Sequence, residues 1–159
     1  MLIDRILTVS FFLIEQITIN LSMRIQKILE TCMYAEDLEA AAKFYGDMLK
    51  LELISWEENR HIFYKCGGGM LLIFNPGHTS AEQTFVNGSP VPLHGAKGPG
   101  HLALAVEEND IPQWKERLIS YNIEIESEVN WPNGCHSIYF RDPSGNSVEL
   151  VSSGLWGMD

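Results

Sequence analysis

A single carboxylate interrupts the apolar strand that the sequence predicts near its C-terminal end. Residues 139–151 read YFRDPSGNSVELV, and Glu149 stands there among valine and leucine. Because successive side chains of a strand point to opposite faces, Glu149 shares a face with Ser147 and Val151. If that face is in water, Glu149 is an ordinary solvated residue. If the face lines a concavity, the buried charge needs a partner such as a metal ion or another cation.

Two half-chains of similar pattern can be laid over each other, and the overlay brings in two more ionisable residues. Each half reads as a strand, a helix and three further strands, in the order βαβββ. In this overlay Glu30 is equivalent to His101 in the two first strands, and Leu72 is equivalent to Glu149 in the two last strands. Three ionisable groups therefore fall on the same side of a sheet at equivalent positions, which solvent exposure alone does not explain.

The helices of the two halves carry clear local signals. Asp37 is a suitable N-cap for a first helix whose apolar residues recur at helical spacing, and Asp110 has the same place before a second helix. Asn122 ends the second helix, and the alternating stretch 122–127, NIEIES, predicts a strand. Each half closes with a hairpin that follows a glycine-rich turn.

The composition indicates one globular domain with an acidic surface. The chain has 159 residues, 45% of them hydrophobic and 20% charged, and a formal net charge of −10. This charge argues against nucleic acid and anionic membranes as partners and favours a small molecule or another protein. The three cysteines, Cys32, Cys66 and Cys135, form no CxxC pair, which indicates reduced thiols in a cytoplasmic protein.

The N-terminal segment does not fit the repeated pattern. Its apolar run is too short to span a bilayer, and no small-residue cleavage site follows it. We interpret residues 1–22 as a peripheral extension ahead of an internal start near Met23. The stretch between the two halves is rich in Gly, Pro and Ser, and its length suggests a binding loop or lid. The predicted boundaries are a domain at 23–152, with module 1 at about 24–76, a loop at 77–97 and module 2 at about 98–152, followed by a tail at 153–159.

Three stretches of the sequence resemble the vicinal oxygen chelate superfamily, which includes glyoxalase I, extradiol dioxygenases, fosfomycin-resistance thiol transferases and bleomycin-resistance proteins. The stretches are AEDLEAAAKFYGDMLKLEL, GPGHLALAVE and YFRDPSGNSVELV, and the resemblance extends over about residues 25–152. It implies an α+β fold in which two βαβββ modules form a curved mixed-sheet cup around a divalent metal ion.

The resemblance also implies a set of metal ligands from the first and last strands of the modules. His101 and Glu149 match the family's ligands in residue type, whereas Glu30 stands where His or Gln is more common. Leu72 occupies the position of a fourth ligand, usually a carboxylate in glyoxalase I, and leucine cannot coordinate a metal. The predicted ligands are thus Glu30, His101 and Glu149, and the ion is Mn²⁺, Fe²⁺, Ni²⁺, Co²⁺ or Zn²⁺.

The function that the resemblance implies is metal-dependent catalysis of the lyase, isomerase or dioxygenase type on a small oxygenated substrate. The ion would stabilise an enolate or oxyanion as a Lewis acid, and Glu30 or Glu149 would act as the base. Tyr64 and His136 are the predicted substrate contacts. The alternative is a metal-free protein that binds a small molecule or drug, like the bleomycin-resistance proteins. Relatives of this size usually form homodimers that can share a site, so we expect a homodimer.

Overall fold

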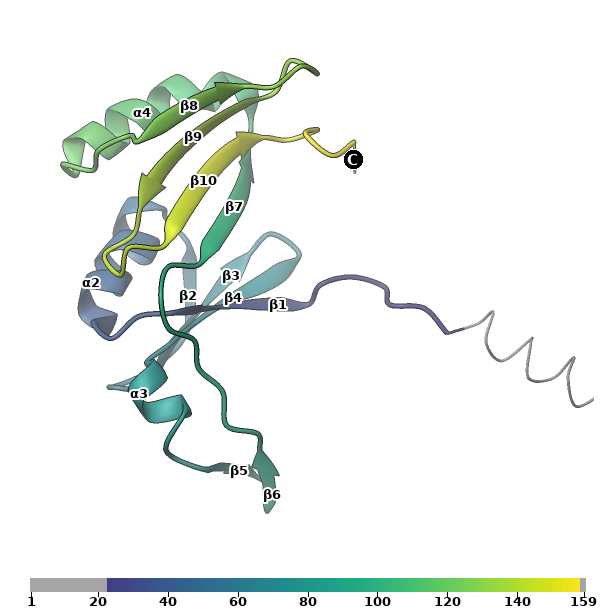
Figure 1. Ribbon diagram of the computed structural model, residues 1–159, viewed down its shortest axis with the longest axis vertical. Coiled ribbons are helices and arrows are strands. Elements are labelled where there is room, and N and C mark those ends of the chain that lie inside the picture. The colour runs from purple at the N-terminus through teal and green to yellow at the C-terminus, as the bar shows by residue number, and fades with distance from the viewer. Residues whose placement is uncertain (1–22, 158–159) are drawn as a thin grey trace, which may run out of the picture.

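Residues 23–157 form the predicted pair of βαβββ modules in a computed structural model of the chain (Figure 1). The proposed N-terminal extension, residues 1–22, and the last two residues of the predicted tail lie outside the described residues. Each module has its own four-stranded mixed sheet, so the α+β prediction is confirmed. Within residues 23–157, no helix is both long and apolar enough to cross a membrane.

The two modules have the same strand order. The sheet of module 1 has the order β1-β4-β3-β2, and that of module 2 has the order β7-β10-β9-β8. In each sheet the first strand is parallel to the last strand of the module, and the other pairs are antiparallel. Module 1 consists of β1 (Glu30–Tyr34), α2 (Leu38–Ala42), the π-helix η1 (Lys43–Met48), β2 (Glu52–Glu57), β3 (His61–Cys66) and β4 (Gly69–Phe74). Module 2 consists of β7 (His101–Val106), the 3-10 helix η2 (Glu108–Asp110), α4 (Ile111–Ser120), β8 (Ser127–Asn130), β9 (His136–Arg141) and β10 (Ser147–Ser152).

The strand registers confirm the predicted overlay of the halves. Leu72 of β4 lies opposite Cys32 of β1, and Glu149 of β10 lies opposite Ala103 of β7. Glu30 precedes Cys32 by two residues, as His101 precedes Ala103. Leu72 and Glu149 are therefore equivalent positions of two equivalent sheets.

The helix ends match the sequence signals in part. The Asp37 side chain accepts a hydrogen bond from the Ala40 N–H (2.9 Å), as expected of an N-cap. Asp110 has the N-cap place of α4 but makes no capping hydrogen bond with its side chain. Asn122 ends the helix with a φ of 54°, a left-handed value that asparagine tolerates.

The predicted strand at 122–127 is wrong, because β8 begins only at Ser127. The Ile123 N–H bonds back to the Leu118 carbonyl (2.9 Å) and closes the helix end. Ile123 and Ile125 then pack against the core, and the backbone first reaches β9 when the Glu126 N–H bonds to the Tyr139 carbonyl (2.8 Å). The alternation of NIEIES reflects this packing rather than strand pairing.

The segment between the modules has structure of its own. It contains the short helix α3 (Pro76–Thr79) and a hairpin of β5 (Thr84–Val86) and β6 (Ser89–Val91), which extends away from both sheets (Figure 1). His94 holds the end of the segment against module 1. Its ring packs on Phe74 at 4.6 Å, and its Nδ1 lies 3.0 Å from the Tyr34 hydroxyl.

The modules pack against each other through α2 and η1. Phe44 of η1 contacts Phe140 of β9, with ring centroids 6.0 Å apart. Arg117 of α4 donates to the backbone carbonyls of Met48 (2.6 Å) and Asp47 (2.7 Å). The buried core contains the helix-facing residues of both sheets, such as Tyr64 and Phe140, in one cluster. The opposite faces of both sheets therefore turn away from the helices that join the modules.

The DPSGN turn at 142–146 ties these pieces together. Asp142 Oδ1 accepts hydrogen bonds from the Ser144 and Asn146 N–H groups, and its Oδ2 accepts one from the Tyr45 hydroxyl (2.8 Å). Burial, and then the Asp142 carboxylate, raise the pKa of Tyr45 and keep it a donor. The Asn146 side chain accepts from the Gly100 N–H (2.7 Å), just before β7. One turn thus joins η1, β7, β9 and β10.

Candidate functional site

Two of the three predicted metal ligands lie together on the outer face of module 2. His101 is the first residue of β7, and Glu149 is in the middle of the neighbouring strand β10. The His101 Nε2 and Glu149 Oε2 atoms are 3.3 Å apart. The pair therefore presents an imidazole nitrogen and a carboxylate oxygen to one point on the sheet.

Burial distinguishes the two readings of Glu149 that the sequence left open. Glu149 is only 4% exposed, whereas the His101 side chain is 53% exposed. Ala103 and Ala105 on the same face of β7 are small and exposed, so the face stays open. Glu149 is therefore a buried carboxylate beneath an accessible surface and not a solvated residue.

The other carboxylate oxygen is held by Ser137, which the sequence did not single out, and Ser137 is held in turn by Trp131. Ser137 of β9 is fully buried, and its hydroxyl donates to Glu149 Oε1 at 2.5 Å. The Trp131 indole N–H donates to the same Ser137 oxygen at 2.8 Å. The alternation of β9 could have placed Ser137 on the Glu149 face, because Ser137 lies opposite Val151. That deduction needs the register of the hairpin, which the sequence does not state.

Tyr139 lies beside the pair on the same face, opposite Glu149 in the register of β9 and β10. Its ring stacks on His101, with centroids 6.3 Å apart and planes 22° apart. Burial first, and then the Glu149 carboxylate, raise the pKa of Tyr139, so this hydroxyl stays protonated. Tyr139 thus offers a hydrogen-bond donor next to the candidate site.

Glu30 does not join this pair within one chain. It is exposed at the start of β1, in the sheet of module 1. Across residues 23–157 there is no group of three or more His, Cys, Asp or Glu side chains placed to hold a metal ion. The reason is the packing of the modules, because the Glu30 face and the Glu149 face both turn away from the helices between them.

Tyr64 and His136, the predicted substrate contacts, lie on the opposite faces of their strands. Tyr64 is 1% exposed and packs beside Tyr45 in the core. His136 points toward α4, where its Nε2 lies 3.3 Å from Glu128 Oε2, and Glu128 in turn pairs with Lys115. The structure therefore brings neither residue to the face of Glu30 or of Glu149. The strand residues that do share those faces are His61 and Phe63 of β3, and Ser137 and Tyr139 of β9.

The outer face of module 1 carries aromatic rings around Leu72. His61 stacks on Phe63 at 4.0 Å, and Phe63 meets Phe74 edge-on at 5.3 Å. His94 covers the other side of Phe74. Burial lowers the pKa of His61, whose Nε2 lies 3.2 Å from the Ser55 hydroxyl. This face is thus apolar and aromatic where the face of module 2 carries a carboxylate.

The comparisons with known proteins agree with the fold and with the resemblance. The family model named Glyoxalase/Bleomycin resistance protein/Dioxygenase superfamily matches residues 27–150. The chain belongs to this superfamily. A curated relative is the metallothiol transferase FosB of Staphylococcus saprophyticus, which is 27% identical over 132 residues, 82% of this chain and 80% of that protein.

Solved structures of this superfamily match most of the chain. A lactoylglutathione lyase from Agrobacterium tumefaciens superposes with a TM-score of 0.77 at 39% identity, over 86% of this chain and 100% of that chain. The fosfomycin resistance protein FosX from Listeria monocytogenes has a TM-score of 0.61 at 20% identity, over 83% of this chain and 94% of that chain, and supports the fold alone. Its structure was determined with Mn(II).

The donor atoms of His101 and Glu149 fit a divalent ion of the kind that the resemblance implies. Imidazole nitrogen and carboxylate oxygen are common ligands of Mn²⁺, Fe²⁺, Co²⁺, Ni²⁺ and Zn²⁺. Two donor atoms 3.3 Å apart can both bind one ion at about 2.1 Å. With Ser137 on Oε1, the free oxygen of Glu149 is the one that faces His101.

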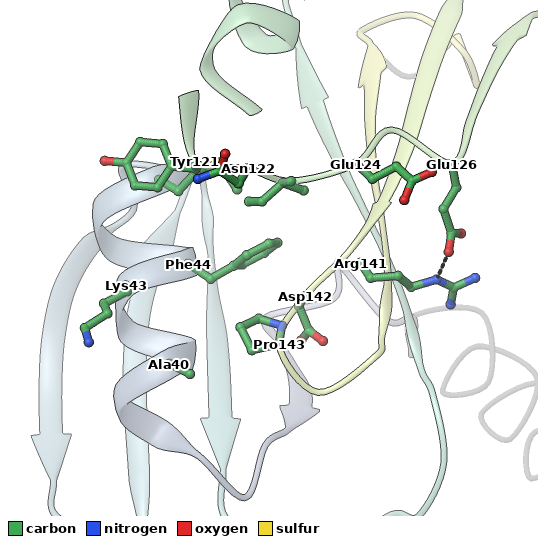
Figure 2. A pocket seen from close by; sticks show the side chains of 12 residues that line it. Ala40, Lys43, Phe44, Tyr121, Asn122, Glu124, Glu126, Arg141, Asp142 and Pro143 are labelled. Carbon is green, nitrogen blue, oxygen red and sulfur yellow. Dashed lines mark hydrogen bonds and ion pairs between the residues drawn. The ribbon is translucent and has the colours of Figure 1, made fainter. Parts of the chain in front are cut away.

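A separate cavity of about 480 Å³ lies between α2 and the end of β9 (Figure 2). Phe44 forms part of its wall, and the Arg141–Glu126 ion pair (2.8 Å) stands at one side. Arg141 also donates to the Gly145 carbonyl, and Asp142 is bound by Tyr45. Arg141, Glu126 and Asp142 are thus already paired with each other or with groups of the turn. Their charges therefore do not indicate a class of ligand for the cavity.

Proposed function

We propose that this member of the glyoxalase superfamily is a divalent-metal-dependent enzyme of the lyase, isomerase or dioxygenase type, with a small oxygenated substrate. The observation that carries the proposal is the 3.3 Å approach of His101 Nε2 and Glu149 Oε2 on an open sheet face. A buried carboxylate whose second oxygen meets an imidazole beneath an accessible surface offers two donor atoms that a cation can use. The name of one relative, a lactoylglutathione lyase, favours the lyase type, and the name of another, a metallothiol transferase, favours metal dependence.

The residues at this site would have three roles: metal ligand, base and hydrogen-bond donor. His101 and Glu149 bind the ion, and Glu30 is the third ligand of the proposed set. The ion supplies Lewis-acid stabilisation of an enolate or oxyanion. Glu30 or Glu149 accepts the proton that the substrate loses, since a carboxylate beside the reacting carbon is a competent base. The Tyr139 hydroxyl, protonated beside His101, donates a hydrogen bond to a substrate oxygen.

The third ligand comes from a second copy of the chain in this proposal. Glu30 is exposed on the outer face of module 1, and the His101–Glu149 pair is accessible on the outer face of module 2. Two copies that pack these faces together in a homodimer would place Glu30 of each beside the pair of the other. The homodimer expected from the resemblance is therefore also what completes the site.

Leu72 bears on the type of reaction. In such a dimer it stands near Glu30, where glyoxalase I would supply a carboxylate, and it leaves a three-ligand set. The lyase reaction is the first to test because the relative at 39% identity is a lactoylglutathione lyase. A three-ligand site is, however, closer in count to a thiol transferase or a dioxygenase than to glyoxalase I.

A metal-free binding protein is the second candidate, and the outer face of module 1 favours it. The rings of His61, Phe63 and Phe74 surround Leu72 there, and Phe63 is the one of these four residues that is not buried, so an apolar ligand would bind beside it. In that case Glu149 would be a structural residue, and its replacement by glutamine would leave ligand binding intact.

The deciding experiment is metal content by elemental mass spectrometry on tag-free protein. We expect about one divalent ion per chain in the wild type, lost in Glu149→Gln and His101→Ala. His136→Ala is the matched control, because His136 lies in the same sheet on the opposite face and should keep the ion. A wild type that is metal-free and takes up none of Mn²⁺, Fe²⁺, Ni²⁺, Co²⁺ or Zn²⁺ would refute the metal-dependent enzyme.

A further inference from the structure

The Glu149 carboxylate ends a chain of hydrogen bonds that starts at Trp131. The indole N–H of Trp131 donates to Ser137 Oγ (2.8 Å), and Ser137 Oγ lies 2.5 Å from Glu149 Oε1. Ser137 is 0% exposed and Glu149 is 4% exposed, so water competes little for these bonds. Three side chains from a turn, β9 and β10 thus form one connected polar network inside an apolar sheet.

The direction of this network follows from the chemistry of its first member. A tryptophan indole nitrogen can only donate a hydrogen bond. Ser137 must therefore accept from Trp131, and its own hydroxyl hydrogen is free to point to Glu149. Oε1 of Glu149 is then an acceptor, and Oε2 remains for His101 and the open face. The network fixes both the rotamer of the carboxylate and the oxygen that it presents.

The turn between β8 and β9 holds Trp131 in place. The Trp131 N–H bonds to the Cys135 carbonyl (2.8 Å), and the Gly134 N–H bonds to the Trp131 carbonyl (2.9 Å). Gly134 has a φ of 89°, a left-handed value that favours glycine. The indole is therefore anchored by its backbone, and the side-chain network starts from a fixed point.

Module 1 provides an internal comparison. His61 of β3 lies two residues along the register from Leu72, as Ser137 of β9 lies two residues from Glu149. At the position equivalent to Ser137, His61 contacts Ser55 and Phe63 instead. The module without the carboxylate thus also lacks the serine that would orient it. This difference between the repeats associates the serine with the carboxylate and not with the fold.

We propose that Trp131 and Ser137 are positioning residues that orient Glu149 for metal binding. This inference rests on the proposed function. Removal of a group that hydrogen-bonds to a metal ligand commonly weakens metal affinity by roughly 10- to 100-fold. Neither residue touches the ion or the substrate in this proposal; both act through Glu149.

The test measures Mn²⁺ affinity by electron paramagnetic resonance of the free ion, together with the visible spectrum of the Co²⁺-loaded protein. We expect Ser137→Ala to weaken Mn²⁺ binding by roughly 10- to 100-fold and to alter the Co²⁺ bands, because the carboxylate can rotate. Trp131→Phe should produce a smaller loss of affinity, since Ser137 can still donate to Glu149. It also leaves Ser137 in place, so it tests the network if Ser137→Ala folds poorly.

Ser152→Ala is the matched control. Ser152 is 3% exposed in β10, and its hydroxyl accepts from the His136 N–H on the opposite face of the sheet. Its replacement removes a buried hydroxyl of the same sheet and should leave Mn²⁺ affinity within about twofold of the wild type. A general loss of stability would affect both serine variants alike.

The failure of this inference differs from the failure of the proposed function. If Ser137→Ala and Trp131→Phe bind Mn²⁺ as the wild type does, while Glu149→Gln does not, the positioning role is refuted and the metal site stands. If the wild type itself binds no divalent ion, the proposed function fails and the positioning role falls with it.

Discussion

Each oxygen of the Glu149 carboxylate has a different environment, and this asymmetry is the main chemical feature of the molecule. Oε1 accepts the Ser137 hydroxyl, and Oε2 faces His101 at 3.3 Å. Taking an ion out of water costs several kcal/mol unless partners replace the lost hydration. The serine replaces part of that hydration, and the imidazole or an ion beside it replaces the rest.

His61 is the residue of module 1 whose protonation the fold disfavours. Burial lowers the pKa of His61 below its ordinary value of 6.5, and Arg60 acts in the same direction, although Glu57 opposes them. Between the two pKa values the unfolded chain binds more protons than the folded one. The free energy of unfolding is therefore not reduced by His61 above pH 6.5. It decreases as the pH falls from 6.5 toward the lower pKa that His61 has in the folded protein.

We therefore predict that His61→Gln flattens the acid side of the stability curve. Urea unfolding between about pH 7.5 and 5.5 should show a smaller decrease in the free energy of unfolding than in the wild type. Ser55→Ala is the control, because it removes the hydroxyl that lies 3.2 Å from His61 Nε2 but keeps the imidazole, so the pH dependence should persist. Parallel curves for His61→Gln and the wild type would contradict the prediction.

At the scale of single elements, the two helices differ in how their first turns are satisfied. Asp37 caps α2 through the Ala40 N–H at 2.9 Å. Asp110 follows the 3-10 turn η2 and makes no such bond with its side chain. The same residue type at the same repeat position therefore has two different energetic roles.

Asp37→Ala should destabilise the protein by about 1 kcal/mol, and Asp110→Ala by clearly less. The loss at Asp37 arises because the Ala40 N–H at the helix start loses its acceptor. Chemical denaturation of the two variants beside the wild type measures both values under one condition. Equal losses would show that the capping bond of Asp37 contributes nothing of its own.

The element scale also shows how far the sequence alone could go. The strands, the helices and the βαβββ order were predictable because the same periodic pattern occurs twice. The faces of Tyr64 and His136 were not predictable, because a shift of one residue in hairpin register moves a side chain to the other face. The overlay placed His101 and Glu149 on one side of a sheet and the resemblance made them common ligands, whereas the role of Ser137 needed the register of β9 against β10.

At the scale of the whole molecule, the two modules pack against each other through their helices, and this packing determines which sheet faces remain accessible. η1 contacts module 2 through Phe44, Tyr45 and Met48. Figure 1 shows α2 on the side of module 1 that is next to module 2. The sheet faces that carry Glu30 and Glu149 are left on the outside. In the proposed homodimer, each chain would contribute two half-sites, and no sequence pattern could state this, because it depends on how the modules pack.

The proposed shared site predicts complementation between two variants that each lack the metal. Glu30→Ala and Glu149→Gln should each lose the metal as homodimers. A mixed dimer of the two has one site with both glutamates intact and one site with both replaced. Co-expression with two different tags and tandem purification isolates this mixed dimer, and elemental analysis should find about half the wild-type metal content.

The same measurement separates a shared site from one built within each chain. If Glu30 reached the His101–Glu149 pair of its own chain, every site of the mixed dimer would carry one substitution, and the metal would be absent. A mixed dimer of Glu149→Gln with His101→Ala is the control, because these residues belong to the same half-site and no intact site can form. Metal binding in the mixed dimer of Glu30→Ala with Glu149→Gln, and not in the mixed dimer of His101→Ala with Glu149→Gln, would show that Glu30 of one subunit completes the His101–Glu149 pair of the other.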